Sequence, residues 1–161
     1  MINLGIKTYF RSILIVSLIA IISAYYIEYV LGHQPCNLCL IERIPYALCL
    51  VLIIFNNTLI KNERFIILLL ILTFIFSFIT SFYHFGIEQG FFEESTVCGL
   101  KNGTDIISKE ELLRQLNKLT ISCKDVTFRV FGLSLTSINI VISLFFTITL
   151  LKIFIRYEKN K

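Results

Sequence analysis

Two cysteines three residues apart, Cys36 and Cys39, are the side chains of this protein best suited to chemistry. They lie in the segment QPCNLCLIER, residues 34–43, with long apolar runs on both sides. Two thiols at this spacing can close a disulfide on one turn of backbone, and a nearby positive charge favours the thiolate that performs disulfide exchange. The same spacing is also half of a zinc site. The pair by itself therefore leaves redox exchange and metal binding open.

The chain contains three further cysteines, which determine the disulfide pairings that are possible. Cys98 and Cys123 lie in the one long polar stretch of the chain, residues 84–132. Cys49 lies in an apolar run, and we expect it to be a small, unreactive core residue. The remaining four cysteines allow three pairings, of which Cys36–Cys39 with Cys98–Cys123 is the simplest.

Static disulfides and a metal site are the alternatives to redox exchange. A Cys-x-x-Cys disulfide closes a very short loop and removes little chain entropy, so a purely structural use is disfavoured. A metal site would add His33 and His84 to the sulfurs, but their positions in the chain do not fit a zinc-binding spacing. The residues favour redox chemistry, and no metal site is predicted.

The composition shows which elements must position these side chains. Hydrophobic residues make up 56% of the 161 residues and charged residues 16%, against about 25% charged in soluble domains. The mean hydropathy is +0.79. These values predict an integral membrane protein, and the absence of a basic stretch interleaved with aromatics argues against nucleic-acid binding. Four apolar stretches are long enough to cross a bilayer, at about residues 12–31, 41–60, 65–83 and 133–155.

Backbone amides inside hydrocarbon must be satisfied within each segment, so all four stretches should be helices. We therefore predict an all-α membrane protein, a four-transmembrane-helix bundle that forms one domain over residues 1–161. Eight of the fifteen Lys and Arg residues lie in the two terminal segments and in residues 61–64. By the positive-inside rule, both termini and that short connection are cytoplasmic, and both cysteine pairs lie on the extracytoplasmic side.

The long extracytoplasmic loop, residues 84–132, should contain one short helix. Ser108 followed by Glu111 fits a capping box, and leucines at positions 112, 113, 116 and 119 fall on one helical face. This amphipathic face is suited either to the membrane surface or to a small core within the loop.

Two ionisable residues stand at the membrane level of the cysteine pair. Arg43 follows the second cysteine by four positions, and a fixed cation at this depth is a functional candidate. Its alternative role is to pair with Glu28 or Glu42 or to reach the head groups. His84 ends the third predicted span and is positioned to donate a hydrogen bond to a bound acceptor, unless it is only an interfacial histidine.

Three motifs resemble those of the DsbB family of bacterial inner-membrane disulfide oxidases. Residues 35–43, PCNLCLIER, match the family signature P-C-x-L-C-x-x-[EQ]-R. Residues 83–88, YHFGIE, are similar to the end of the family's third helix. Residues 131–136, FGLSLT, followed by Asn139, are similar to the start of its fourth helix.

The resemblance implies a function as well as a fold. DsbB proteins are four-helix thiol:quinone oxidoreductases that reoxidise DsbA, a periplasmic thioredoxin-fold protein, and pass the electrons to ubiquinone or menaquinone. By position, Cys98 and Cys123 would exchange with the partner, Cys98 forming the mixed disulfide. Cys36 and Cys39 would be the membrane-proximal redox pair, with Cys39 facing the quinone and Arg43 polarising it. His84 would correspond to a quinone-pocket histidine.

Two other classes of protein compete with this interpretation. A vitamin-K-epoxide-reductase-like quinone and thiol protein carries its Cys-x-x-Cys near the start of its last helix, whereas here the pair precedes the second. A non-enzymatic membrane scaffold would use the cysteines as permanent disulfides, insensitive to quinone or reductant. The location implied by the family is the bacterial inner membrane.

Overall fold

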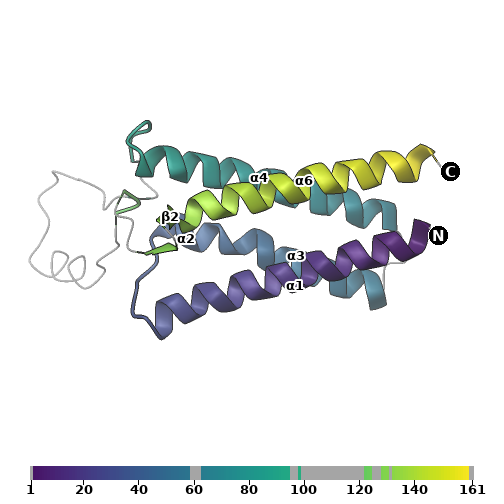
Figure 1. Cartoon of the computed structure of the whole chain (residues 1–161), viewed down its shortest axis with the longest axis horizontal. Helices are drawn as coiled ribbons and strands as arrows, with labels where there is room; N and C mark the ends of the chain where they lie inside the picture. The colour runs from purple at the N-terminus through teal and green to yellow at the C-terminus, as the bar shows by residue number, and fades with distance from the viewer. Residues whose placement is uncertain are drawn as a thin grey trace, which may run out of the picture.

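Four long helices lie side by side in the computed structural model, which describes residues 2–58, 63–94, 98, 122–124, 128–130 and 132–159 (Figure 1). The elements are α1 (Ile2–Tyr29), α2 (Asn37–Ile41), α3 (Arg43–Thr58), α4 (Glu63–Glu88), β1 (Arg129–Val130), β2 (Leu133–Ser134) and α6 (Leu135–Lys159). Both termini lie at one end of the bundle, here called the termini end. The segments that carry the cysteine pairs lie at the opposite end, here called the loop end.

The predicted fold class is confirmed, because four helical stretches are long and apolar enough to cross a membrane. These stretches are Lys7–Tyr29, Asn37–Phe55, Glu63–Glu88 and Leu135–Arg156. Within the described residues, strand structure is limited to a two-residue pair in which Arg129 faces Ser134 and Val130 faces Leu133. The amphipathic helix predicted at residues 108–119 lies outside the described residues.

The predicted span boundaries differ from the helices by several residues. The second span begins at Asn37 rather than at residue 41, and the third continues to Glu88 rather than ending at residue 83. Apolar runs mark only the part of a helix that contacts hydrocarbon, whereas backbone hydrogen bonds carry the helix on through polar side chains that have partners. His84 therefore lies inside α4, and the predicted loop start at residue 84 is wrong by one helical turn.

The second transmembrane stretch is divided at Glu42, between α2 and α3. Glu42 caps α2 with an αR backbone at φ −65° and ψ −17°. Pro45 follows in the first turn of α3, where its missing N–H removes little from the helix. Since proline cannot donate to the carbonyl four residues earlier, it weakens the connection to α2 and leaves the Cys36–Ile41 segment as a separate turn.

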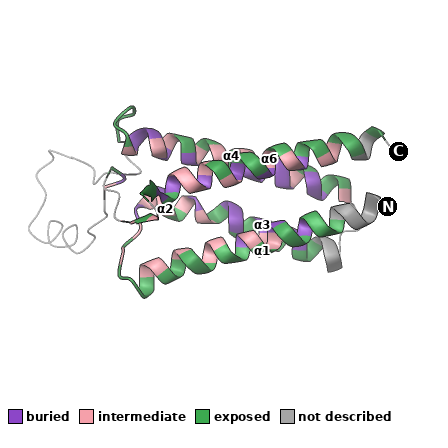
Figure 2. Cartoon of the chain, in the orientation of Figure 1, coloured by how far each residue is buried: buried purple, intermediate pink, exposed green. Residues whose placement is uncertain are grey.

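The helices pack around an apolar centre that extends toward the termini end. Contacts are densest between α4 and α6, followed by α1 with α3 and α3 with α4, whereas α1 and α6 touch at few points. The bundle core consists of these buried residues: Phe10, Ile13, Tyr46, Cys49, Ile53, Ile66, Ile67, Leu70, Ile71, Phe74, Phe146 and Leu150. Exposed residues recur along the long helices (Figure 2). Many of them are large and apolar, such as Ile22 and Val141, which are 58% and 66% exposed. Such a surface suits lipid rather than water.

Glycines shape the two turns that close the loop end. Phe92 folds back over the last turn of α4, and its ring occupies the space that a side chain on Gly86 would fill, 2.1 Å from an added Cβ. The backbone reverses after α4 at Gly90, with φ +77°, and again between the two strands at Gly132, with φ +83°. Only glycine adopts these angles without strain. Together these turns bring the end of α4 and the start of α6 beside α2.

Candidate active site

A cavity of about 400 Å³ opens at the loop end, with α1 on one side and α6 on the other. Its walls are mostly apolar, and both cysteines of the Cys-x-x-Cys pair contribute to the lining. So does Cys123 from the long loop. Ligand sites of this size typically combine apolar walls with a few placed polar groups. The sparse contact between α1 and α6 leaves this space between them.

Cys36 is the N-cap of α2, so its sulfur takes part in the helix start. Cys36 Sγ accepts a hydrogen bond from the backbone N–H of Cys39 at 3.2 Å. Both residues are free thiols in this structure. A hydrogen bond from the Cys39 side chain, opposed by burial and assisted by His84, lowers the pKa of the Cys36 thiol to about 5. A thiolate at Cys36 is therefore favoured at neutral pH.

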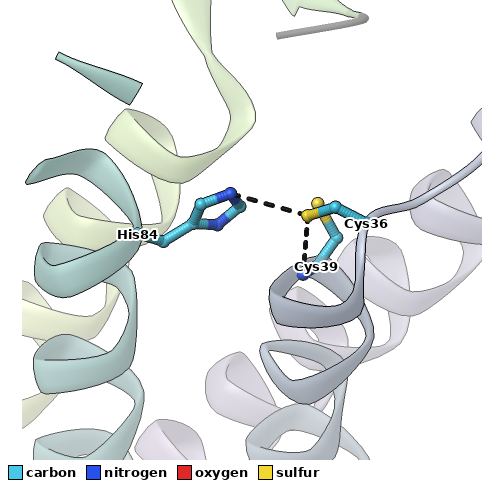
Figure 3. A group of neighbouring side chains, drawn as sticks. All are labelled: Cys36, Cys39 and His84. Atoms are coloured by element: carbon cyan, nitrogen blue, oxygen red, sulfur yellow. Dashed lines mark hydrogen bonds between the residues drawn. The ribbon is translucent and has the colours of Figure 1, made fainter. Parts of the chain in front are cut away.

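His84 faces this sulfur from α4 (Figure 3). Its Nε2 lies 3.6 Å from Cys36 Sγ, and its Nδ1 lies 2.8 Å from Glu42 Oε1. The His84 residue is only 2% exposed. The two sulfurs and a ring nitrogen of His84 all lie within 4.8 Å of one another, close enough to hold a metal ion. A sulfur, an imidazole and a carboxylate in this order also have the arrangement of an activated nucleophile.

Glu42 connects this group to a chain of polar side chains inside the bundle. Its Oε2 accepts a hydrogen bond from Asn139 Nδ2 at 3.0 Å, and the same amide donates to Ser81 Oγ at 2.7 Å. Asn139 Oδ1 accepts from the Tyr46 hydroxyl and, at 3.3 Å, from Ser143 Oγ. All of the potential hydrogen bonds of the Asn139 side chain are thus made, and this offsets the cost of burying an amide at membrane depth.

Arg43 points away from the sulfurs toward α1. Its Nη1 lies 2.5 Å from Glu28 Oε2, and its guanidinium lies 5.2 Å from the centre of the Tyr25 ring. Pairing with Glu28 is among the alternative roles that the sequence allowed for Arg43. Arg43 nevertheless lines the cavity together with Cys39, so the guanidinium is both ion-paired and adjacent to the site.

Glu88, one turn beyond His84 on α4, is the least satisfied polar group of the site. Its Oε1 accepts a hydrogen bond from Thr136 Oγ1 at 2.6 Å and lies 3.9 Å from His84 Nε2. Its side chain is 5% exposed, and within the described part of the chain its buried Oε2 has no hydrogen-bond partner. Glu88 also lines the cavity. A buried carboxylate oxygen without a partner is costly unless a further group contacts it.

The loop disulfide reaches the same place. Cys98 and Cys123 are bonded, with Cα atoms 5.4 Å apart. They pack in one buried cluster with Cys36, Leu38 and Ile87, here called the loop-end cluster. The disulfide joins two positions 25 residues apart in the sequence, and both of its cysteines pack against the segment that carries the Cys-x-x-Cys pair.

The structure thus brings together the four candidate cysteines, Arg43 and His84. It does not contain the predicted Cys36–Cys39 disulfide, and this pair is present as a dithiol. His84 is buried and contacts Cys36. His33 lies on the cavity wall, where its ring meets Phe128 with centres 5.4 Å apart.

Sequence reasoning assigned no site role to Glu42, Glu88 and Asn139. The available signal was their polarity: each stands in or beside an apolar span, where a polar side chain marks a functional or packing role. Which of them share a site depends on how α3, α4 and α6 are rotated against one another. That information is absent from the local sequence.

Comparison with known proteins identifies relatives along nearly the whole chain. The family model described as disulfide bond formation protein DsbB matches residues 7–153. An uncharacterized protein of Rickettsia prowazekii (strain Madrid E) is 28% identical over 150 residues, which is 91% of this chain and 86% of the relative. No solved structure matches the chain.

Proposed function

The chain belongs to the DsbB family of disulfide bond formation proteins, and from this premise we propose that it is a thiol:quinone oxidoreductase of the bacterial inner membrane. It takes electrons from a DsbA-like periplasmic thioredoxin-fold protein and passes them to ubiquinone or menaquinone. The loop disulfide is the entry point, and the Cys36/Cys39 pair is the exit. Both termini lie in the cytoplasm and the cysteines on the periplasmic side.

One observation carries this proposal. Cys123 of the loop disulfide and both cysteines of the Cys-x-x-Cys pair line a single cavity. Disulfide exchange requires a thiolate to reach a disulfide sulfur, so two pairs that act in series must come together at one point. Permanent disulfides in a scaffold have no need of this proximity, nor of a free dithiol beside a histidine.

The cavity fits a quinone ring in size and in character. About 400 Å³ accommodates a substituted ring, and the apolar side chains of α1 and α6 suit a lipid-soluble molecule. Cys39 and Arg43, both on the cavity wall, would contact the ring. When bound, a quinone supplies a two-electron, two-proton acceptor whose reduction can drive formation of an oxidising disulfide.

The side chains around the sulfurs handle the protons. Oxidation of the dithiol would form the Cys36–Cys39 bond and release two electrons and two protons, one proton from Cys39 and the other from Cys36 or from His84 when His84 holds it. A bound quinone would accept both electrons and both protons. His84 Nε2, 3.6 Å from Cys36 Sγ, is placed to hold the Cys36 proton. Glu42, 2.8 Å from Nδ1, orients the ring and stabilises its protonated form.

Anaerobic quinone reduction by the purified, detergent-solubilised protein tests the proposal. The assay supplies a reduced thioredoxin-fold donor and follows the loss of quinone absorbance. We expect turnover in the wild type and none in Cys39→Ser or Cys98→Ser, because each variant interrupts one of the two pairs.

The matched control is Cys49→Ala, since Cys49 is a free buried cysteine that is not among the residues lining the cavity. It should keep wild-type turnover. Normal turnover in Cys39→Ser would refute the assignment of the exit pair. If the wild type reduced neither quinone with any of several donors, the oxidoreductase proposal would be refuted and the scaffold interpretation would be favoured.

A further inference from the structure

The Cys36/Cys39 dithiol and His84 have the geometry of a zinc site. Zinc binds thiolate at about 2.3 Å and imidazole at about 2.0–2.1 Å with tetrahedral angles, which places ligand atoms about 3.6–3.8 Å apart. Cys36 Sγ and His84 Nε2 are 3.6 Å apart, and Cys39 Sγ completes a group within 4.8 Å. Small side-chain movements would bring all three atoms to one ion.

The surroundings of His84 match those of a metal ligand. A ligating histidine usually gives its other ring nitrogen to a carboxylate, which fixes the tautomer and directs the free nitrogen at the metal. Glu42 Oε1 holds Nδ1 at 2.8 Å, so Nε2 points to the sulfurs. Asn139 in turn fixes Glu42 through its other oxygen at 3.0 Å. The histidine is therefore oriented before any ion arrives.

Glu88 offers the fourth ligand. Among the residues that the structure describes, none donates a hydrogen bond to its buried Oε2, its side chain is 5% exposed, and it lines the same cavity as the two sulfurs. Its other oxygen, Oε1, is 3.9 Å from His84 Nε2. Carboxylate oxygen is an ordinary zinc ligand, and coordination would give this oxygen the partner that it lacks.

We propose that Cys36, Cys39, His84 and Glu88 form a redox-gated site for Zn²⁺ that opposes the oxidase reaction. Binding replaces the two thiol protons by Zn–S bonds and changes no oxidation state. A Cys36–Cys39 disulfide has no thiolate to offer, so only the dithiol form binds the ion. Zn²⁺ held by both sulfurs prevents them from joining, and it therefore stops electron transfer once the Cys36–Cys39 disulfide has been reduced to the dithiol.

This inference rests on the proposed function only for its consequence, since binding itself needs neither donor nor quinone. The test therefore begins with Zn²⁺ alone. The full chain with Cys98→Ala and Cys123→Ala is used, because reduction of the loop disulfide would otherwise create a second pair of thiols. Zn²⁺ affinity is measured against a chromophoric chelator, once after reduction and once after oxidation of the remaining pair.

We expect one Zn²⁺ per chain in the dithiol form and none in the disulfide form. His84→Gln and Glu42→Gln should each weaken binding by about 10–100-fold, the usual effect of losing a ligand or its orienting partner. Glu88→Gln should weaken binding as well, by about 10-fold. Cys49→Ala, the matched control, should bind one Zn²⁺ with the affinity of its parent. Co²⁺ in place of Zn²⁺ should give the visible absorption of a tetrahedral thiolate site.

Absence of binding to the dithiol form would overturn the proposal. So would unchanged affinity in both His84→Gln and Glu42→Gln, since binding would then be simple chelation by two thiols. Unchanged affinity in Glu88→Gln would overturn its assignment as the fourth ligand. Co²⁺ absorption reports the coordination directly, and size-exclusion chromatography reports folding. A variant that merely fails to fold is recognised because it loses both metal binding and monodisperse elution.

Quinone reduction by the wild type then links the site to function. Reduced donor in excess over the chain keeps it cycling through the dithiol form, and Zn²⁺ should lower turnover, with recovery on adding chelator. A protein that binds Zn²⁺ but never reduces quinone would contradict the proposed function and leave the metal site standing. A protein that turns over unaffected by bound Zn²⁺ would contradict the opposing role.

Discussion

Two buried free cysteines of this chain, Cys36 and Cys49, stand in regions that differ in nearly every chemical respect. Cys36 is 5% exposed and Cys49 is fully buried, so burial alone hardly distinguishes them. Cys36 contacts an imidazole and a backbone N–H in the loop-end cluster. Cys49 packs among Ile53, Phe74 and other members of the bundle core. The contrast teaches that neighbouring donors and charges, rather than depth, decide whether a cysteine in this bundle is reactive.

The polar side chains follow the same division. Glu42, His84 and Asn139 form their chain of hydrogen bonds toward the loop end. Farther into the bundle, neutral hydroxyls donate to one another, as between Ser77 and Ser143 at 2.8 Å, or to a backbone carbonyl, as from Thr73 to Leu69 at 2.8 Å. Ionisable side chains that are removed from water need hydrogen-bonding partners. In this bundle the partners of Glu42 and His84 lie at the loop end, beside the Cys-x-x-Cys pair. The bundle core supplies stability, and the loop end supplies reactivity.

The largest expected difference between the regions is in the pH dependence of alkylation. In the Cys39→Ser, Cys98→Ala, Cys123→Ala variant only Cys36 and Cys49 remain, and the serine keeps a donor beside Cys36. With the pKa of Cys36 lowered to about 5, its thiolate stays populated from pH 8 down to pH 6 and is lost only as the pH falls through 5. Over the same interval the thiolate fraction of an ordinary cysteine, of pKa about 8.5, falls roughly 80-fold.

Alkylation rates in the presence of a metal chelator, resolved by mass spectrometry of the labelled peptides, measure this difference. The Cys36 rate should change by less than about twofold between pH 8 and pH 6. Cys49 should be labelled only after the protein is unfolded. A Cys36 rate that falls in parallel with that of a free thiol would remove the distinction between the two cysteines.

The next effect separates stability from activity. Leu70→Ala leaves a cavity in the bundle core and should lower the free energy of unfolding by about 2–5 kcal/mol, with quinone reduction per folded molecule nearly unchanged. Asn139→Leu removes the partner of Glu42 Oε2 and should destabilise less, by about 1–3 kcal/mol. Its turnover should nevertheless fall by roughly 10-fold to 100-fold, because Glu42 no longer holds the His84 ring in place.

Unfolding in mixed detergent micelles and quinone reduction on the same preparations check both variants. Both have side chains buried inside the bundle, so equal handling is expected during purification. If Leu70→Ala lost as much turnover per folded molecule as Asn139→Leu, the two regions would not be functionally separate.

The smallest expected effect concerns Arg43. Arg43→Lys keeps the charge but loses the planar group that pairs with Glu28 at 2.5 Å and lies over Tyr25. We expect the KM for quinone to rise about 5-fold with little change in kcat, since Arg43 lines the cavity wall and its guanidinium is held by Glu28. Steady-state kinetics with a short-chain quinone measure both constants. An unchanged KM would show that Arg43 does not contribute to quinone binding and that its role is limited to its contacts with Glu28 and Tyr25 on α1.

Much of the architecture could be read from the chain because hydrocarbon restricts the backbone to few choices. An apolar stretch of about 20 residues has to be a helix there, so four such stretches predict four helices. The ends were less predictable. α4 continues through His84 to Glu88 because Glu42 and Thr136, on other helices, give its polar side chains partners. A hydropathy pattern contains no information about such partners.

The sequence by itself determined the class of this protein and its four spans, because these follow from composition. It also determined which cysteines have redox spacing, because that depends only on their separation along the chain. The tertiary structure alone decided which side chains meet. His84 is 48 positions from Cys36 and Asn139 is 97 positions from Glu42, yet each pair is in contact. The rotation and packing of α3, α4 and α6 set these contacts, and they depend on the whole bundle at once. That rotation also makes His84, which the sequence offered as a donor to a bound acceptor, the buried neighbour of a thiol.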